Sequence, residues 1–394
     1  MKAVCLAAAL GVASYGCTET TELIAAPPVC VAPGPIVHLG GTENSTCAGA
    51  VASVVGRYAL CTCSDLTVTG SLSVNPPRDM RGPASPPGIP PPPSFISAVG
   101  TDGSASISGF THVKGSLVAA GVGGVLLADA GMISGNVRSG GGLRTLTRMP
   151  FLVSGDAFVN GNVDGPFVIQ GAIHLPATSA IAPDVNGGSV TQEPVSVSAP
   201  CDCANGPAFD IGAAVAARKT KNANASLGFA DTQLASESNT ETIDWPCGEY
   251  YLTEIRTDQN AALEFRIHGH VGVFVAGDVR LGNNLHVTLD PGADLDLVVA
   301  GSFFMTGQVF GSPATPALTR LWVASTTVSL PEQVQFGAAV YAPAAVFSAG
   351  VGLTFSGTLF VDTLSVKGDV RITYDPTAVE AGQSCGVAAP ARVE

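Results

Sequence analysis

Short runs in which apolar and polar residues alternate recur along most of the chain, and each run ends at a glycine. Val113-Lys114-Gly115 is one example. Alternation with a period of two is typical of a β-strand that is buried on one face, and glycine lets the backbone turn with a positive φ at no steric cost. The pattern predicts many short strands joined by tight corners. The same three-residue pattern stands at 68–70, 107–109, 133–135, 153–155, 159–161, 169–171, 267–269 and 366–368.

A longer repeat stands in the second half of the chain. Val275, Val299 and Val323 occupy equivalent places in similar segments and are 24 residues apart each time, with looser echoes at 340–343 and 359–362. Repeats of this length built from short strands are typical of a β-solenoid, in which each coil stacks on the previous one. We therefore predict an all-β protein, a β-solenoid (β-helix), with the three valines inward on adjacent coils. A β-sandwich, with strands every 8 to 12 residues, is the alternative.

One segment departs from the strand pattern. Residues 207–221 are rich in alanine, and Ile211 and Val215 stand four apart, as on one face of a helix. We expect one short accessory helix near 208–221, outside the stack of strands.

Composition shifts divide the chain further. Residues 18–46 are rich in Thr and Glu and then in Pro and Ala, a composition that buries little and suits a tether. Residues 76–93 hold nine prolines and predict a long extended insertion. The expected organisation is a signal peptide at 1–16, a tether at 17–46, a Gly-rich β-repeat region at 47–200 with the Pro-rich insertion at 76–93, a Cys/helix segment at 201–230, a carboxy-terminal β-solenoid domain at 240–376 and a tail at 377–394.

The amino terminus has the pattern of an export signal. Met1 and Lys2 are followed by an apolar run of about eleven residues, which is shorter than the roughly 20 residues that span a bilayer. Gly16 then directly precedes Cys17, which resembles the lipobox of bacterial lipoproteins. We expect Cys17 to carry a lipid. The alternative is cleavage after Ala13, which would give a free secreted protein.

Composition and charge limit the fold and the kinds of molecule that the protein is expected to bind. The chain has 394 residues, of which 46% are hydrophobic and 12% charged, with 47 Gly and 28 Pro. A folded, turn-rich protein is expected, because ordinary domains have about a quarter of their residues charged. The net charge of −13 opposes binding to nucleic acid and to anionic lipid headgroups.

The ten cysteines agree with export. If Cys5 leaves with the signal peptide and Cys17 carries the lipid, an even number remains, which fits four disulfides in an oxidising compartment. The pairs at Cys61/Cys63 and 201/203 are separated by one residue, so each should bond to another segment; zinc bound by these four thiolates is the alternative. The disulfide candidates are Cys30, Cys47, Cys61, Cys63, Cys201, Cys203, Cys247 and Cys385.

Few residues indicate chemistry. Asp290, Asp294 and Asp296 surround Pro291-Gly292 and form a weak calcium candidate. Ordinary turn chemistry, with Asp294 and Asp296 on one outward strand face, is the simpler interpretation, so we expect no metal and no other cofactor. His268 and His270 share a strand face, with His286 as a conceivable third metal ligand. Nothing selects a catalytic pair among Arg266, Arg280, Arg320, Arg371, Asp278, Asp362 and Asp369.

Several motifs in residues 195–376 carry a resemblance to a known family. They include Cys201-Asp202-Cys203, Trp245-Pro246-Cys247 and the closing Ile372-Thr373-Tyr374-Asp375. The segment resembles an uncharacterised family of bacterial exported lipoproteins with a β-helical carboxy-terminal domain, and is distantly similar to the polymer-forming bactofilins. The resemblance implies export, lipidation and a solenoid, and supplies no catalytic residues. A histidine often stands in that family where Thr373 stands here.

These observations leave two classes of function. The first is a surface-displayed lipoprotein with a structural or adhesive role and no enzymatic activity, held on the bacterial outer membrane or cell surface by its lipid. A surface polymer or a second copy of the chain would be its partner. The alternative is a carbohydrate-binding or carbohydrate-active β-helix protein.

Overall fold

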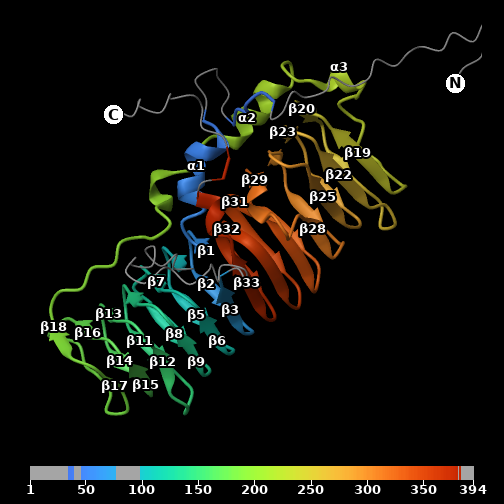
Figure 1. Ribbon diagram of the computed structural model, residues 1–394. Helices are drawn as coiled ribbons and strands as arrows, with labels where there is room; N and C mark the ends of the chain where they lie inside the picture. The colour runs from blue at the N-terminus through green and yellow to red at the C-terminus, as the bar shows by residue number, and fades with distance from the viewer. Residues whose placement is uncertain (1–33, 40–45, 77–97, 380, 383–394) are drawn as a thin grey trace, which may run out of the picture.

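The computed structural model of the protein (Figure 1) describes residues 34–39, 46–76, 98–379 and 381–382. The described chain forms a parallel β-solenoid of about 13 coils with few helices, so the predicted fold class is confirmed and the sandwich alternative is wrong. Each coil has three sides, which we call faces A, B and C, and the chain passes through them in that order.

Face A is one continuous parallel sheet, and its side chains include the three valines of the 24-residue repeat. In stack order its strands are β20 (Gly248–Leu252), β23 (His270–Val275), β26 (Asp294–Val299), β29 (Thr319–Val323), the middle of β31 (Val334–Ala349), the middle of β32 (Leu353–Val366), β1 (Leu60–Thr62), β4 (Val99–Thr101), β7 (Leu117–Ala119), β10 (Val137–Ser139), β13 (Ala157–Val159), β16 (Ile173–Leu175) and β18 (Val190–Gln192).

Faces B and C are built in the same way. Face B consists of β21 (Ile255–Arg256), β24 (Val279–Leu281), β27 (Phe303–Met305), β30 (Thr327–Leu330), the ends of β31 and β32, β2 (Leu66–Val68), β5 (Ala105–Ile107), β8 (Val125–Leu127), β11 (Leu143–Thr145) and β14 (Val163–Asp164). Face C consists of β19 (Glu241–Trp245), β22 (Leu263–Ile267), β25 (Leu285–Leu289), β28 (Val309–Gly311), the starts of β31 and β32, β33 (Val370–Tyr374), β3 (Leu72–Asn75), β6 (Thr111–Val113), β9 (Gly131–Ile133), β12 (Phe151–Val153), β15 (Phe167–Ile169) and β17 (Asn186–Gly187).

The inward side chains form the core. Val275 pairs with Val299 and Val299 with Val323 on adjacent strands, and all three are fully buried, as the 24-residue spacing predicts. Burying one such side chain stabilises the fold by roughly 1.5–3 kcal/mol. The wide coils of this half are filled by stacked aromatic rings, such as Phe310 on Phe336 with ring centroids 4.3 Å apart.

The main role of the glycines at the corners is to allow close packing between coils rather than to allow the backbone to turn. Gly70, Gly109, Gly277 and Gly301 do not have a positive φ, contrary to the expectation from the sequence. A Cβ atom on Gly109 would collide with the backbone of Gly70 on the next coil, and one on Gly301 would collide with the backbone of Gly277. The coils can therefore approach to strand spacing at these corners only because no side chain stands between them.

The order of the coils in space differs from their order in the chain. The first coil, β1–β3, lies in the middle of the stack: it pairs with β32 and β33 on one side and with β4–β6 on the other. From it, the amino-terminal stack (β1–β18) grows towards one end of the molecule. The chain then returns to the opposite end, where β19 begins the carboxy-terminal stack (β19–β33), which grows back towards β1–β3 (Figure 1).

The helices lie on the outside of the stack. They are α1 (Ala48–Val55), α2 (Ile211–Arg218) and α3 (Asn224–Leu227), together with the 3₁₀ turns η1 (Cys203–Asn205), η2 (Pro316–Leu318) and η3 (Pro376–Val379). Helix α2 is the accessory helix expected near 208–221, and it is capped by Asp210, whose side chain accepts a hydrogen bond from the Ala213 N–H. It contacts β20, β23 and β26 on face A.

Several expectations from the sequence fall on parts of the chain that are not described. The signal peptide, Cys17, Cys30, Cys385, nearly all of the Pro-rich insertion and most of the tether and tail lie outside the described residues. In the part of the chain that is described, no helix is long and apolar enough to cross a membrane.

Candidate functional site

Residues 201–227, which we call the clasp, cover the outer side of face A in the carboxy-terminal stack together with residues 37–39 and α1. The clasp begins at Cys201, continues through η1 and α2, and ends with α3 (Figure 1). Beneath it lies a column of outward side chains that are paired from strand to strand, and these are buried although they point away from the solenoid core. The column consists of Tyr251, Phe274, Val298, Trp322, Tyr341, Phe360 and Cys61.

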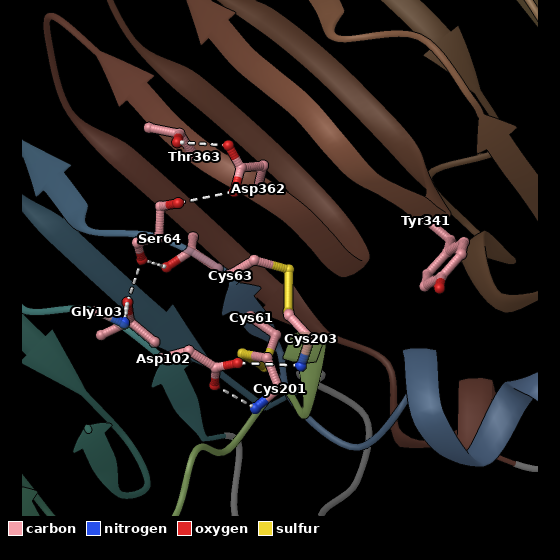
Figure 2. The surroundings of a disulfide bond; sticks show 12 residues. Cys61, Cys63, Ser64, Asp102, Gly103, Cys201, Cys203, Tyr341, Asp362 and Thr363 are labelled. Atoms are coloured by element: carbon pink, nitrogen blue, oxygen red, sulfur yellow. Dashed lines mark hydrogen bonds between the residues drawn. A yellow bond between two sulfur atoms is a disulfide. The ribbon is translucent and has the colours of Figure 1, made fainter. Parts of the chain in front are cut away.

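Two disulfides fasten the start of the clasp to the first coil (Figure 2). Cys61 bonds to Cys201 and Cys63 bonds to Cys203, each across 140 residues of chain. The prediction that each cysteine would pair with another segment is confirmed, and zinc binding by these four residues is wrong because their sulfur atoms are bonded to each other. Asp102 orients the segment, since its carboxylate accepts hydrogen bonds from the Cys201 N–H at 2.8 Å and the Cys203 N–H at 3.1 Å.

The middle of the clasp inserts an aromatic ring into the buried column. Phe209 packs edge-on against Trp322, with ring centroids 5.2 Å apart, and stacks near Tyr341 at 6.3 Å. The Tyr341 hydroxyl accepts a hydrogen bond from the Ala208 N–H at 2.6 Å. Burial raises the pKa of Tyr341, and this hydrogen bond to the hydroxyl oxygen partly offsets the rise. These contacts seal the column against water.

The end of the clasp is held by polar contacts. Arg218 forms an ion pair with Glu249 at 2.5 Å, donates to the His38 carbonyl at 2.6 Å and lies 5.0 Å from the centre of the Phe274 ring. In α3, the Asn224 amide donates to the Tyr251 carbonyl at 2.6 Å and accepts from the Tyr251 N–H at 3.0 Å. Because both partners of each contact are buried or half-buried, the clasp is fixed in one register on face A.

A buried charge network lies on β26 and β29, next to the column. Arg320 donates to Asp296 at 2.7 and 2.8 Å and forms an ion pair with Asp294 at 3.0 Å, and the Trp322 indole donates to Asp296 at 2.8 Å. Burial alone would lower the pKa of Arg320, but the two carboxylates raise it, so the guanidinium stays charged. His270 contacts Asp294 at 2.8 Å through its Nδ1 atom. All carboxylate oxygens that face Arg320 are thus engaged within the protein.

The three aspartates of the calcium candidate therefore serve different partners. Asp296 is 1% exposed rather than lying on an open outward face, because the outer side of face A is covered. Asp294 is buried against Arg320 and His270, whereas Asp290 bonds to His268. Among the residues that the structure describes, no group of three or more His, Cys, Asp or Glu side chains is arranged to hold a metal ion.

An exposed polar cluster occupies face C in the first coils of the carboxy-terminal stack. His268 lies between two carboxylates from neighbouring coils, with Nδ1 2.8 Å from Asp290 and Nε2 3.2 Å from Asp244. The hydrogen bond to Asp290 is the largest effect and raises the pKa of His268; burial lowers the pKa by less, and the hydrogen bond to Asp244 raises it by a still smaller amount. His286 belongs to the next strand, where it pairs with Glu264 in register. The cluster can hold a proton between two carboxylates, and it ties three coils together.

The remaining charged candidates are spread over separate ion pairs. Arg266 pairs with Glu264 and Arg280 with Asp278, while Asp362 accepts a hydrogen bond from the Ser64 hydroxyl at 2.8 Å. The structure does not bring them to one place.

Sequence reasoning missed an apolar surface on face C of the amino-terminal stack, which we call the apolar panel. It lines an open hollow, and its most exposed members are Phe110 (50%) and Met149 (58%). Contiguous exposed apolar surface of this kind is typical of interaction sites. A signal existed in the sequence, because His112, Met132 and Leu152 stand 20 residues apart at outward positions of paired strands. The panel consists of Phe110, His112, Met132, Met149, Pro150 and Leu152.

Comparison with known proteins adds one finding. Residues 201–380 are similar to a family described as "Domain of unknown function (DUF7305)". The match begins at the first cysteine of the clasp and ends just after η3, so it contains the clasp and the carboxy-terminal stack but not the first coil, β1–β3. No curated protein and no solved structure matches the chain.

Proposed function

We propose that this protein is an exported lipoprotein, anchored to the bacterial outer membrane or cell surface through Cys17, with a structural or adhesive role. The observation that supports it most is the disulfide bonding of the described cysteines. Beyond the two bonds of the clasp, Cys47 and Cys247 are also disulfide-bonded. Disulfides of this number persist in oxidising compartments and are rare in the cytosol.

The architecture supports a structural role. A stack of about 13 coils forms a long body with a continuous core, and the charged groups on its described faces are largely paired with one another rather than directed at a common point. Such a body displays surfaces at fixed spacing. In this role the protein carries out no reaction of its own, and its partner is a surface polymer or a second copy of the chain.

The anchoring hypothesis is tested by Cys17→Ser. Several acyl chains hold a protein on a membrane firmly, whereas the protein without them has no comparable anchor. We expect the variant to move from the detergent phase to the soluble exported fraction, while Cys5→Ser, within the expected signal peptide, leaves the detergent partitioning of the protein unchanged. Unaltered partitioning of the Cys17→Ser variant would rule out lipid anchoring.

Carbohydrate binding is the second candidate, and the apolar panel supports it. Ligand sites are concave and mostly apolar with a few polar groups, and here Phe110 and His112 stand beside one open hollow. If a glycan is the ligand, Phe110→Ala should weaken retention of the protein on the purified surface polysaccharide at least several-fold. Val351→Ala, which alters an equally exposed apolar residue on another part of the stack, should have no effect. Equal retention of both variants would argue against this function.

A further inference from the structure

The carboxy-terminal stack is joined to the amino-terminal part of the chain by coil pairing, by the two clasp disulfides, by the packing of residues 37–39 and α1, and by one short connector in the backbone. The pairing consists of parallel backbone ladders from β32 and β33 to β1–β3, which are of the same kind as those within each stack. The connector is residues 193–200, between the end of β18 and Cys201. In Figure 1 it runs along the outside of the amino-terminal stack back to the first coil.

This connector is almost fully extended. On face A, the path from β18 back to β1 crosses six strand spacings, through β16, β13, β10, β7 and β4. At about 4.8 Å per spacing this is about 29 Å. The nine residue steps from Gln192 to Cys201 reach at most about 30–32 Å. The closed arrangement therefore leaves this segment little conformational freedom.

The connector is also held only at its ends. Within the described chain, residues 194–199 make no hydrogen bond, and most of them are exposed. At one end, Glu193 bonds to Leu175 and His174. At the other end, Pro200 lies against Gly100, where a Cβ atom would stand 3.0 Å from it. Moving the connector to another path would thus break few contacts.

From these observations we infer that residues 201–380 exchange between two copies of this chain. In the exchanged dimer, the carboxy-terminal stack and clasp of one copy pair with β1–β3 of the other, and Cys201 and Cys203 bond to the partner copy's cysteines at positions 61 and 63. Every coil contact and both clasp disulfides of the closed form are kept, and the contacts of residues 37–39 and α1 with the carboxy-terminal stack form between the two copies in the same way. Within the described chain, the backbone changes its path only at the connector. A short, extended hinge favours such exchange.

The reach of the connector limits the shape of this dimer. In each copy, the connector spans at most about 32 Å, and it must lead from that copy's β18 to β1 of the other copy. The two amino-terminal stacks therefore lie side by side and antiparallel, with the end of each beside the first coil of the other. The similarity of residues 201–380 to a single domain family agrees with their moving as one unit.

Two variants with complementary cysteine losses test the exchange. One chain carries Cys61→Ser and Cys63→Ser, and the other carries Cys201→Ser and Cys203→Ser, so neither can close the clasp disulfides within itself. Refolded together under oxidising conditions, they should form a covalent heterodimer on non-reducing gels, which reduction separates. Each chain refolded alone, or mixed after folding, is the control and should not form this species. Monomers alone after co-refolding would overturn the inference.

The length of the connector supplies an independent test on the full chain. Six Gly/Ser residues inserted after Val197 relieve the extension, so the fraction of wild-type-cysteine protein that elutes as a disulfide-linked dimer should fall several-fold. The same insertion after Val122, which is 93% exposed, should leave this fraction unchanged. Two results would contradict the exchange. In the first, the wild-type chain forms no dimer as its concentration is raised during oxidative refolding. In the second, the dimer fraction is unchanged after the connector is lengthened.

Discussion

At the scale of single residues, Asp296 is an outward residue that is nevertheless buried. Its neighbours in sequence place it on the outer side of β26, but its carboxylate accepts hydrogen bonds from Arg320 and Trp322 in a dry interior. Removing one partner of a buried ion pair costs about 3–5 kcal/mol, because the other charge stays buried without compensation. Although alternation places Asp296 on an outward strand face, its substitution is therefore expected to be costly.

We predict that Asp296→Asn lowers the free energy of unfolding by about 3 kcal/mol, as measured by urea denaturation. Glu264→Gln is the matched control, because Glu264 also pairs with an arginine but its side chain is 35% exposed. Its effect should stay below about 1 kcal/mol. A loss of the same size in both variants would show that the clasp does not exclude water from β26.

The second residue-scale prediction concerns His268. Its raised pKa means that the folded protein binds the proton more tightly than the unfolded chain, so its contribution to stability is complete below about pH 6.5, the ordinary histidine value. The contribution is lost as the pH rises through the raised pKa. In an NMR titration, Asp290→Asn should lower the pKa of His268 towards its ordinary value, and Asp244→Asn should lower it less. A larger effect of Asp244→Asn would contradict the assigned order.

At the scale of elements, strands only a few residues long are stable because those between the two end coils are paired on both sides in a register that repeats. Val299 lies between Val275 and Val323 and is fully buried. Val299→Asp would place an unpaired carboxylate between two coils, which should cost several kcal/mol or prevent folding. Val346→Asp provides the control on β31, since Val346 is 43% exposed, and it should change the midpoint of unfolding little. The measurement is the yield of soluble protein and its thermal midpoint.

At the scale of the whole molecule, the two clasp disulfides bridge the same two segments, so both close nearly the same long loop. The first bond formed closes a loop of 140 residues, which in the chain-entropy treatment stabilises the fold by about 5 kcal/mol. Once it exists, the second bond closes a ring of only a few residues and adds about 2 kcal/mol at most. The two bonds are therefore strongly non-additive.

We accordingly expect the double variant Cys63→Ser, Cys203→Ser to lose no more than about 2 kcal/mol of unfolding free energy. Loss of all four cysteines should cost about 5 kcal/mol or more, measured by denaturation under non-reducing conditions. A smaller loss of unfolding free energy in the fourfold variant than in the double variant would indicate strain in the native bonds.

Much of the architecture could be predicted from the sequence because it depends on local periodicity. The 24-residue step placed Val275, Val299 and Val323 correctly, and the alanine-rich run placed α2 outside the stack. The cysteine spacing required partners in other segments, but it could not identify them. The pairing of Cys61 with Cys201 depends on a connector that returns past five strands to reach β1, and no local pattern encodes that path.

The candidate calcium site and the corner glycines show where local patterns mislead. Alternation assigned Asp294 and Asp296 to an outward face, and this is correct with respect to the solenoid core. It could not show that segments from earlier in the chain, residues 201–227 and 37–39, cover the outer side of that face. The sequence pattern identified the corner glycines but predicted that they allow the backbone to turn, whereas in the structure they allow close contact with the next coil.

The sequence by itself determined the repeating unit of this protein: short strands, the coil length and the inward valines, because each depends on neighbours within about one coil. The tertiary structure alone decided the order of the coils. It placed the first coil, β1–β3, between the carboxy-terminal stack and the coil β4–β6, directed the clasp across face A and buried Asp296 and Arg320 beside it. The physical reason is that every coil edge offers the same backbone hydrogen bonds, so the choice between edges depends on the length of the connector and on the side chains that the returning segment covers.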